Sequence, residues 1–386
     1  MGKTFIVSVL EFLVLLVFVF ALKIESTLWF LVLLGSVIFV IFYINKNSLI
    51  KEKLREIFVS TKRFTIVLGI ILLFVFPLFF TDSPYWVFVI TIGVIYIILA
   101  IGLNMMLGSL DLVNLGFAAF FGLGAYTVGM ITAKYGLHLP YLIVFLLAGI
   151  VAMIFGLLLC LPTMGMKGYY FSLTTIAFGL AVELTINNLE WTGGPGGIKN
   201  IPHISLFGLN LGNSYTIFGY ELPFQINYFY FALVIMLFVM LVAWLIHNSR
   251  IGLAWNAIKE DDIAARAQGI NIKVYRIYAF TLGSFIAGLA GAIFAPLMGY
   301  IAPTNFTYAH SITMVAMVIL GGIDNIAGIA LGAFLLSIAP EKFRAFSDYR
   351  MLIYALIIIL MVIYRPQGLI PKKIRKYDFI GGAKDE

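Results

Sequence analysis

The chain has 386 residues, of which 62% are hydrophobic and 11% are charged, whereas an ordinary soluble domain has about 45–50% apolar and about 25% charged residues. This composition predicts an all-α polytopic integral membrane protein and excludes a disordered chain, a nucleic-acid-binding module and a secreted disulfide scaffold. The formal net charge is +7, and in a membrane protein the positions of Lys and Arg predict which loops remain in the cytoplasm. The single cysteine, Cys160, lies in an apolar run and is interpreted as a packing residue.

Several apolar runs are long enough to cross about 30 Å of hydrocarbon, which takes about 20 helical residues. They fall near residues 4–22, 27–44, 64–80, 85–107, 112–134, 140–161, 169–187, 225–247, 277–299 and 350–364. The first run is predicted to be a retained span and not a signal peptide, because Glu11 interrupts it and no small-residue cleavage site follows Leu22. With the N-terminus inside, the basic segments 45–63 and 248–276 both lie in the cytoplasm, as the positive-inside rule requires.

The stretch 311–340 determines on which side of the membrane the chain ends. A single tilted span there would leave the basic tail outside, whereas two short passes divided at Gly321 and Gly322 return the tail to the cytoplasm. We therefore expect about 10–12 transmembrane helices, some of them short or broken, with both termini in the cytoplasm. Irregular backbone at membrane depth is tolerated only where protein or a water-filled cavity covers it, so Gly321 and Gly322 are candidates for a pathway or gate.

Few polar residues suit catalysis or metal binding. The four histidines, His138, His203, His247 and His310, are scattered near span ends, without an i, i+4 pair or a cluster of acids or cysteines. No stretch fits a nucleotide-binding loop. The sequence therefore predicts no catalytic residue, no cofactor and no metal site in this chain, and we do not expect the chain to hydrolyse ATP.

Two polar features near the outer face are candidates for the transport pathway. Glu183 lies about one turn from the outer end of its span, and an intramembrane carboxylate is a functional candidate because its burial is costly. The alternative is that Glu183 simply reaches the outer interface. In the segment TGGPGGI, Gly193 and Gly194 are predicted to form a rigid outer turn. That turn would be a gate or a seat for a soluble partner.

The cytoplasmic loop 248–276 has the composition of a short helix. Its alanines favour helix, Glu260 and Asp261 lie in the N-terminal half where the helix dipole favours anions, and Gly269 is placed for a C-cap. These signals predict one helix over about 256–267, with a small alanine face and a charged face. Such a helix either only connects two spans or docks into a groove on a soluble partner.

The run AIKEDDIAARAQGIN, at 257–271, resembles the coupling loop of binding-protein-dependent ABC permeases, specifically the branched-chain amino acid permease family of the LivM type. Other segments are similar to stretches of that family in the same order: LGFAAFFGLGAY (115–126), TGGPGGI (192–198), GLAGAIFA (288–295), MVILGGIDNIAG (317–328) and RPQGLIP (365–371). The residues that correspond to the coupling element by motif position are Glu260, Asp261, Ala264, Ala265 and Gly269. Leu180 departs from the family, since an AFGE-like motif usually places a glutamate there, and Glu183 follows one turn later.

The resemblance implies a type II ABC importer-like permease. Its core would cover 81–371, after variable N-terminal helices and a basic cytoplasmic loop over 1–80 and before a basic cytoplasmic tail over 372–386. The implied partners are a second permease subunit (LivH type), two ABC ATPase subunits (LivG and LivF type) that hold ATP and Mg, a periplasmic or lipoprotein substrate-binding protein, and membrane lipid. The implied location is the bacterial cell membrane.

The resemblance predicts the mechanism more sharply than the substrate. Import of the branched-chain amino acids Leu, Ile and Val is expected, and permeases for urea or short-chain amides resemble the same family. An ion-coupled secondary transporter would need a coupling-ion site near the bilayer midplane, and the spans lack paired charges for one. A polytopic membrane enzyme would need clustered His, Asp or Glu at one interface, and the sequence has no such cluster.

Overall fold

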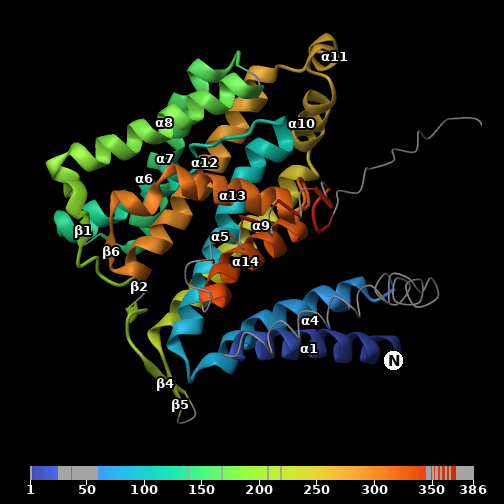
Figure 1. The fold of residues 1–386 in the computed structure, drawn as a ribbon, viewed down its shortest axis with the longest axis vertical. Helices are drawn as coiled ribbons and strands as arrows, with labels where there is room; N and C mark the ends of the chain where they lie inside the picture. The colour runs from blue at the N-terminus through green and yellow to red at the C-terminus, as the bar shows by residue number, and fades with distance from the viewer. Residues whose placement is uncertain are drawn as a thin grey trace, which may run out of the picture.

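The computed structural model describes residues 2–24, 36, 60–137, 139–166, 168–206, 208–217 and 220–344, together with short stretches between 349 and 370. The predicted span 27–44, most of the basic loop 45–63, much of the span 350–364 and the tail 372–386 lie outside the described residues. The described chain is mostly helical (Figure 1), which confirms the predicted fold class.

The α-helices of the described chain are α1 (Gly2–Lys23), α4 (Lys62–Val75), α5 (Pro84–Leu110), α6 (Ala118–Gly129), α7 (Tyr141–Thr163), α8 (Gly168–Asn188), α9 (Phe224–His247), α10 (Arg250–Glu260), α11 (Asp262–Ala267), α12 (Ile272–Met298), α13 (Tyr308–Gly321) and α14 (Ile326–Lys342). Shorter helical segments are η1 (Phe76–Phe80), the π-helical η2 (Met130–Lys134), η3 (Glu190–Thr192), η4 (Gly194–Gly196) and η5 (Pro303–Phe306).

The described strands form three antiparallel pairs of two strands. β1 (Ile198–Lys199) pairs with β6 (Tyr300–Ile301), with Ile198 opposite Ile301. β2 (Ser205–Leu206) pairs with β3 (Leu209–Asn210), and β4 (Tyr215–Ile217) pairs with β5 (Tyr220–Leu222). The first of these pairs joins the segment after α8 to the end of α12, although the two are far apart in the sequence.

Five helices of the described chain are long and apolar enough to cross a membrane: α5, α7, α8, α9 and α12, with 27, 23, 21, 24 and 27 residues. Their bounds agree with the predicted runs to within about five residues. The agreement has a simple cause, since the thickness of the hydrocarbon sets the length of an apolar helix. The run 4–22 is also helical, as α1, and the run 64–80 is helical as α4 and η1.

The predicted span 112–134 is wrong in its first part, because α6 begins only at Ala118. Asp111 closes α5 in the left-handed conformation, with φ 56°. Beyond it the Asn114 side chain accepts a hydrogen bond from Gly116 N at 2.9 Å, and Leu115 N donates to Oγ1 of Thr175 on α8 at 3.1 Å. In this segment the side chains of Asn114 and Thr175 accept the backbone N–H hydrogen bonds that carbonyl groups would accept in a helix. Asn side chains commonly do this in turns.

The division of the stretch 311–340 is confirmed. α13 ends at Gly321, α14 begins at Ile326, and the two have 14 and 17 residues. Gly322 has φ 113° and Asp324 has φ 64°, so the turn between the helices uses backbone conformations that interrupt a helix.

Helix α12 lies in the middle of the bundle, between α7, α6 and α5 (Figure 1). Glycines allow this close packing: a Cβ added to Gly124 of α6 would lie 2.3 Å from the carbonyl oxygen of Gly288 of α12. Small residues at contacts of this kind are characteristic of membrane helix bundles. The segment GLAGAIFA is therefore a packing face in this structure.

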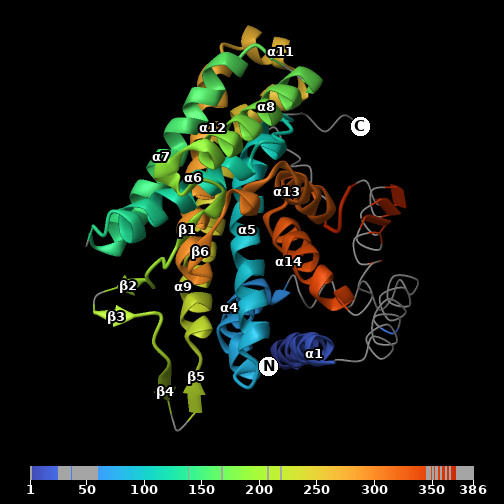
Figure 2. The same ribbon diagram turned by 60° about the vertical axis from the view of Figure 1, so that its left-hand side comes forward.

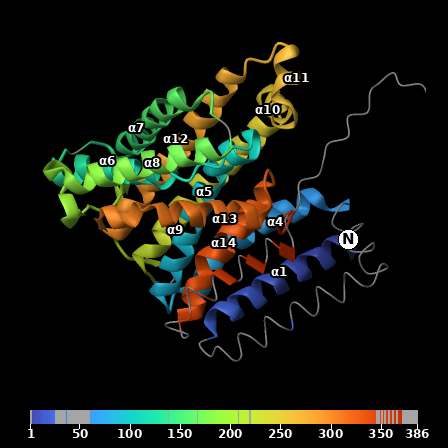
Figure 3. The same ribbon diagram turned by 45° about the horizontal axis from the view of Figure 1, so that its top comes forward.

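The two ends of the molecule differ in character. Helices α10 and α11 lie at one end, here called the coupling end, and the strands β4 and β5 lie at the opposite end (Figures 1 and 2). Helices α1 and α4 run side by side along one flank (Figure 3). Lys342, at the end of α14, donates to the carbonyl oxygens of Leu22 and Ile24 at 2.6 and 3.1 Å, which joins the end of α1 to the rest of the bundle.

Candidate functional site

The predicted coupling helix over 256–267 is wrong as a single helix, because the structure divides it into α10 and α11 at Asp261. Asp261 has an extended backbone, with φ −156° and ψ 112°. Its Oδ1 accepts hydrogen bonds from Ile263 N at 2.8 Å and Ala264 N at 3.1 Å. A carboxylate that caps a new helix in this way competes with continuation of the previous one. The preceding helix begins earlier than predicted, with Ser249 as its N-cap.

The predicted C-cap at Gly269 is confirmed. Gly269 has φ 82°, its N–H donates to Arg266 O at 2.9 Å, and Ile270 N donates to Ala265 O at 3.0 Å. These are the two hydrogen bonds of a Schellman motif. Because a left-handed backbone is easy only for glycine, Gly269 ends α11 and turns the chain toward α12.

The predicted coupling residues differ in exposure. Glu260, Asp261, Ala264 and Gly269 are exposed at the coupling end, whereas Ala265 is only 3% exposed and faces the chain itself. Ile263, which sequence reasoning did not select, is 76% exposed beside them. The sequence does carry a signal for Ile263: it is a large apolar residue two positions after Asp261, and Asp is a residue type that often caps helices. The exposed face of α11 therefore combines one large apolar side chain with acidic groups.

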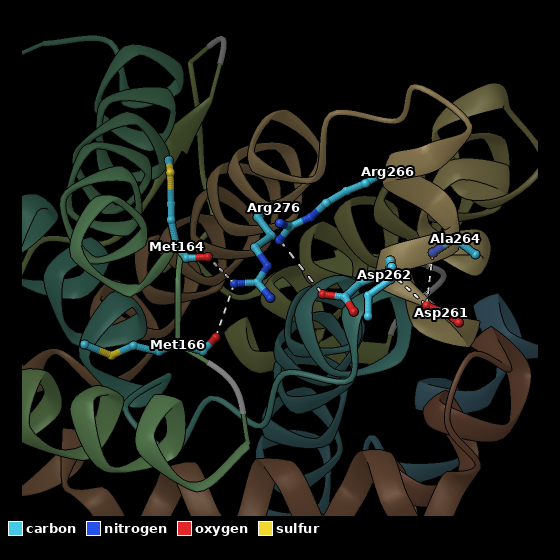
Figure 4. Close-up of polar contacts among 8 residues, drawn as sticks. Met164, Met166, Asp261, Asp262, Ala264, Arg266 and Arg276 are labelled. Carbon is cyan, nitrogen blue, oxygen red and sulfur yellow. Dashed lines mark hydrogen bonds and ion pairs between the residues drawn. The ribbon is translucent and has the colours of Figure 1, made fainter.

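The coupling loop is attached to the neighbouring α7–α8 connection through Arg276 of α12. Its guanidinium donates to the carbonyl oxygens of Met164 and Met166 at the end of α7, and Figure 4 shows the side chain aimed at both. Arg276 is 6% exposed, and a cation at the last carbonyls of a helix is favourable. Nearby, Arg266 lies 4.0 Å from Asp262 within α11 (Figure 4).

The glycines proposed as a gate lie in close packing at the turn between α13 and α14. A Cβ added to Gly321 would lie 2.5 Å from Gly328 O, and one added to Gly322 would lie 2.4 Å from Ile370 O. Leu369 N donates to Leu320 O at 2.8 Å, so residues 367–370 run directly over the turn. Residues 367–370 of RPQGLIP thus pack on the motif MVILGGIDNIAG, whose Gly321 and Gly322 are buried.

The outer candidates belong to α8 and the turns that follow it. Glu183 is partly exposed on α8, which among its described side chains buries few: Phe171, Thr175 and Ile186. Gly193 is exposed with φ 86°, and Gly194 is buried with φ 54°. A Cβ added to Gly193 would lie 2.2 Å from Gly197 O, which confirms a tight glycine-dependent turn. Glu183 lies on α8 and Gly321 ends α13, so the two candidates belong to different helices.

Sequence reasoning missed a buried contact between α6 and α13. The first residue of α6, Ala118, donates its N–H to Oγ of Ser311 in the first turn of α13 at 2.9 Å, and both residues are buried. Two helix N-termini from distant parts of the chain therefore meet inside the bundle. No sequence pattern pairs Ala118 with Ser311, because the contact depends on the tertiary fold.

The described residues show no group of three or more His, Cys, Asp or Glu side chains that could hold a metal ion. His203 Nδ1 lies 3.0 Å from the hydroxyl of Tyr228, and His310 Nδ1 lies 3.1 Å from Oγ1 of Thr307. These two histidines are therefore engaged in local hydrogen bonds. Cys160 is 1% exposed, as expected of a packing residue.

Five helices of the described chain are long and apolar enough to cross a membrane, which indicates a multi-pass membrane protein. Residues 85–363 match the family described as branched-chain amino acid transport system / permease component. The chain belongs to this family, and as a permease component of an ABC transport system it is not itself catalytic. No solved structure matches the chain.

Named relatives agree with this assignment. The chain is 37% identical over 298 residues to the high-affinity branched-chain amino acid transport system permease protein LivM of Escherichia coli (strain K12). The matched region covers 73% of this chain and 69% of that protein. The protein of the same name from Salmonella typhimurium (strain LT2) gives the same values. The autoinducer 2 import system permease protein LsrC of Yersinia pseudotuberculosis is 28% identical over 251 residues, 63% of this chain and 65% of that protein.

Proposed function

We propose that this permease imports the branched-chain amino acids Leu, Ile and Val. The observation that carries the proposal is the 37% identity to LivM over 73% of the chain. The largely apolar spans are consistent with a pathway that passes a substrate without holding it tightly, so that a periplasmic or lipoprotein binding protein selects it. A permease for urea or short-chain amides is the second candidate.

The proposed complex contains a second permease subunit of the LivH type and two ATPase subunits of the LivG and LivF types, which would bind ATP and Mg. The exposed face of α11, with Asp261, Ile263 and Ala264, would dock into a groove of one ATPase subunit. Helix-in-groove binding places apolar side chains of a helix in a hydrophobic groove, and Ile263 is the large apolar side chain that α11 exposes. Glu260 and Gly269 border this face, and the buried Ala265 would hold it against α12.

Movement of the ATPase subunits would then reach the membrane as a rigid-body shift of α10 and α11. Both termini would lie in the cytoplasm with the coupling end, and the Gly193–Gly194 turn would lie on the outer side. In this arrangement Glu183 and the Gly193–Gly194 turn are candidates for the outer opening of the pathway. Gly321 and Gly322 would act as a hinge or gate at the inner side.

The proposal is tested by uptake of labelled leucine and urea into proteoliposomes that carry the whole complex, with and without ATP. We expect ATP-dependent leucine uptake that Gly269→Pro abolishes, because proline permits neither φ 82° nor the hydrogen bond to Arg266 O. Gly136→Pro is the matched control, since Gly136 has φ 58° and its Cβ position is open. Urea uptake without leucine uptake would favour the second candidate. Uptake driven by an ion gradient without ATP would contradict both.

A further inference from the structure

One ion pair joins the coupling loop to a distant part of the bundle. Lys259, in the last turn of α10, places Nζ 3.1 Å from Oδ2 of Asp324, in the turn between α13 and α14. The same Nζ donates to Gly108 O near the end of α5 at 2.9 Å. Lys259 therefore joins the end of α10 to the end of α5 and to the turn between α13 and α14.

The acidic partner is held in a fixed position. The Asp324 side chain is 2% exposed, compared with 30% for the Lys259 side chain. Asp324 has a left-handed backbone, and its N–H donates to Oδ1 of the buried Asn104 on α5 at 3.1 Å. A Cβ at Gly108 would lie 2.1 Å from Asp324 Oδ1, so glycine is required for this approach. Three separate features thus place one carboxylate where α10 can reach it.

The burial of Asp324 means that the pair resists separation. Removal of the cation would leave a buried charge without its partner, which is costly in a protein interior. The pair Asp262–Arg266, 4.0 Å apart and within one helix, has side chains that are 21% and 68% exposed, so separation leaves neither charge fully buried. When α10 moves, breaking the contact between Lys259 and Asp324 would be costly. The α13–α14 turn is therefore expected to move with α10.

We propose that Lys259 and Asp324 form a strut that makes the α13–α14 turn move together with the coupling loop. The strut rests on the proposed function, in which ATP-driven movement enters through α10 and α11. Residues 367–370 and α14 pack directly on the same turn, so displacement of Asp324 displaces both helices that the turn connects. Lys259 and Asp324 are positioning residues, and neither contacts substrate or ATP.

The test uses the complete complex in proteoliposomes with three variants: Lys259→Met, Asp324→Asn and the double variant. The single variants disturb the charge balance of a buried site, so we expect less assembled complex. The double variant removes both charges and restores assembly. If the pair transmits movement, the double variant hydrolyses ATP but imports less substrate per ATP, by about fivefold or more, the lower range of typical coupling between sites. Recovery of the wild-type import per ATP would show that the pair is only structural.

A second measurement does not depend on the substrate. Amide hydrogen exchange over residues 318–328 is compared with and without a non-hydrolysable ATP analogue. We expect the analogue to change exchange in the wild-type complex and to have no effect there in the double variant. An unchanged rate in the wild type would overturn the strut. If the wild type responds and the double variant does not, the strut stands even when no leucine is imported, and only the proposed substrate fails.

Two controls match the chemistry of these variants. Lys273→Met and Asp82→Asn remove the same charged groups at exposed positions. Both variants are expected to keep the wild-type amount of import per ATP and the wild-type exchange response. A similar loss in either control would show that charge itself, and not the contact between Lys259 and Asp324, is responsible, and would overturn the proposal.

Discussion

Individual glycine residues, which lack a Cβ atom, determine how closely the helices of this permease approach one another. Gly288 of α12 shows this twice, because Gly124 of α6 lies against one side of it and Ala148 of α7 against another. The sequence identifies GLAGAIFA as an unusual run, but it does not say which helices meet there. Which helices meet depends on the tertiary structure, because glycine pairs on different helices share no sequence pattern.

We expect Gly288→Ala to destabilise the protein by about 1–3 kcal/mol, the usual cost of overpacking. The new methyl group would lie 2.5 Å from Ala148 O and 2.7 Å from the Cβ of Ala152, so α7 would have to move. Thermal unfolding in detergent measures the change as a lower Tm. Gly165→Ala is the control, because no atom lies within 4 Å of its Cβ position. Equal Tm values for the two variants would show that α12 and α7 are not in direct contact.

At the scale of elements, the sequence predicts helices well where the membrane sets their length and poorly where side chains interrupt them. The long spans α5, α7, α9 and α12 follow directly from apolar run length. Asn114 lies in the segment that delays the start of α6, and Asp261 divides the predicted helix over 256–267, because their side chains accept hydrogen bonds from backbone N–H groups. Asp261 is a recognisable N-cap residue by type, whereas the contact of Leu115 with Thr175 depends on the fold.

The capping role of Asp261 predicts a difference between two variants. Asp261→Ala should destabilise α11 by about 0.5–2 kcal/mol, because Ile263 N and Ala264 N lose their acceptor. Asp261→Asn should leave α11 intact, since asparagine caps equally well. Amide hydrogen exchange over residues 263–267 is the measurement. Faster exchange in both variants would indicate that the negative charge, and not the cap, maintains α11.

For the whole molecule, the sequence predicts a multi-pass permease and its family, while the way its parts are joined comes from the structure. The motifs MVILGGIDNIAG and RPQGLIP are separate in the sequence and packed together in space, at Gly322 and Ile370. The contact of Lys259 with Asp324 joins a third motif of the same resemblance, AIKEDDIAARAQGIN, to MVILGGIDNIAG. Three of the motifs that resemble the family, and not all of them, therefore meet where α10 contacts the α13–α14 turn.

The orientation of the molecule can be tested with two surface positions at opposite ends. Leu209 of β3 is 61% exposed and Ile263 of α11 is 76% exposed. If the basic loops lie inside, as we propose, we expect Leu209 outside the cell and Ile263 in the cytoplasm. In a Cys160→Ala background, a membrane-impermeant maleimide should label Leu209→Cys in intact spheroplasts and Ile263→Cys only in inside-out vesicles. Labelling of both after denaturation controls for thiol reactivity. The reverse pattern would place α10 and α11 outside, where no ATPase subunit could reach them, and the coupling role of the loop would then be wrong.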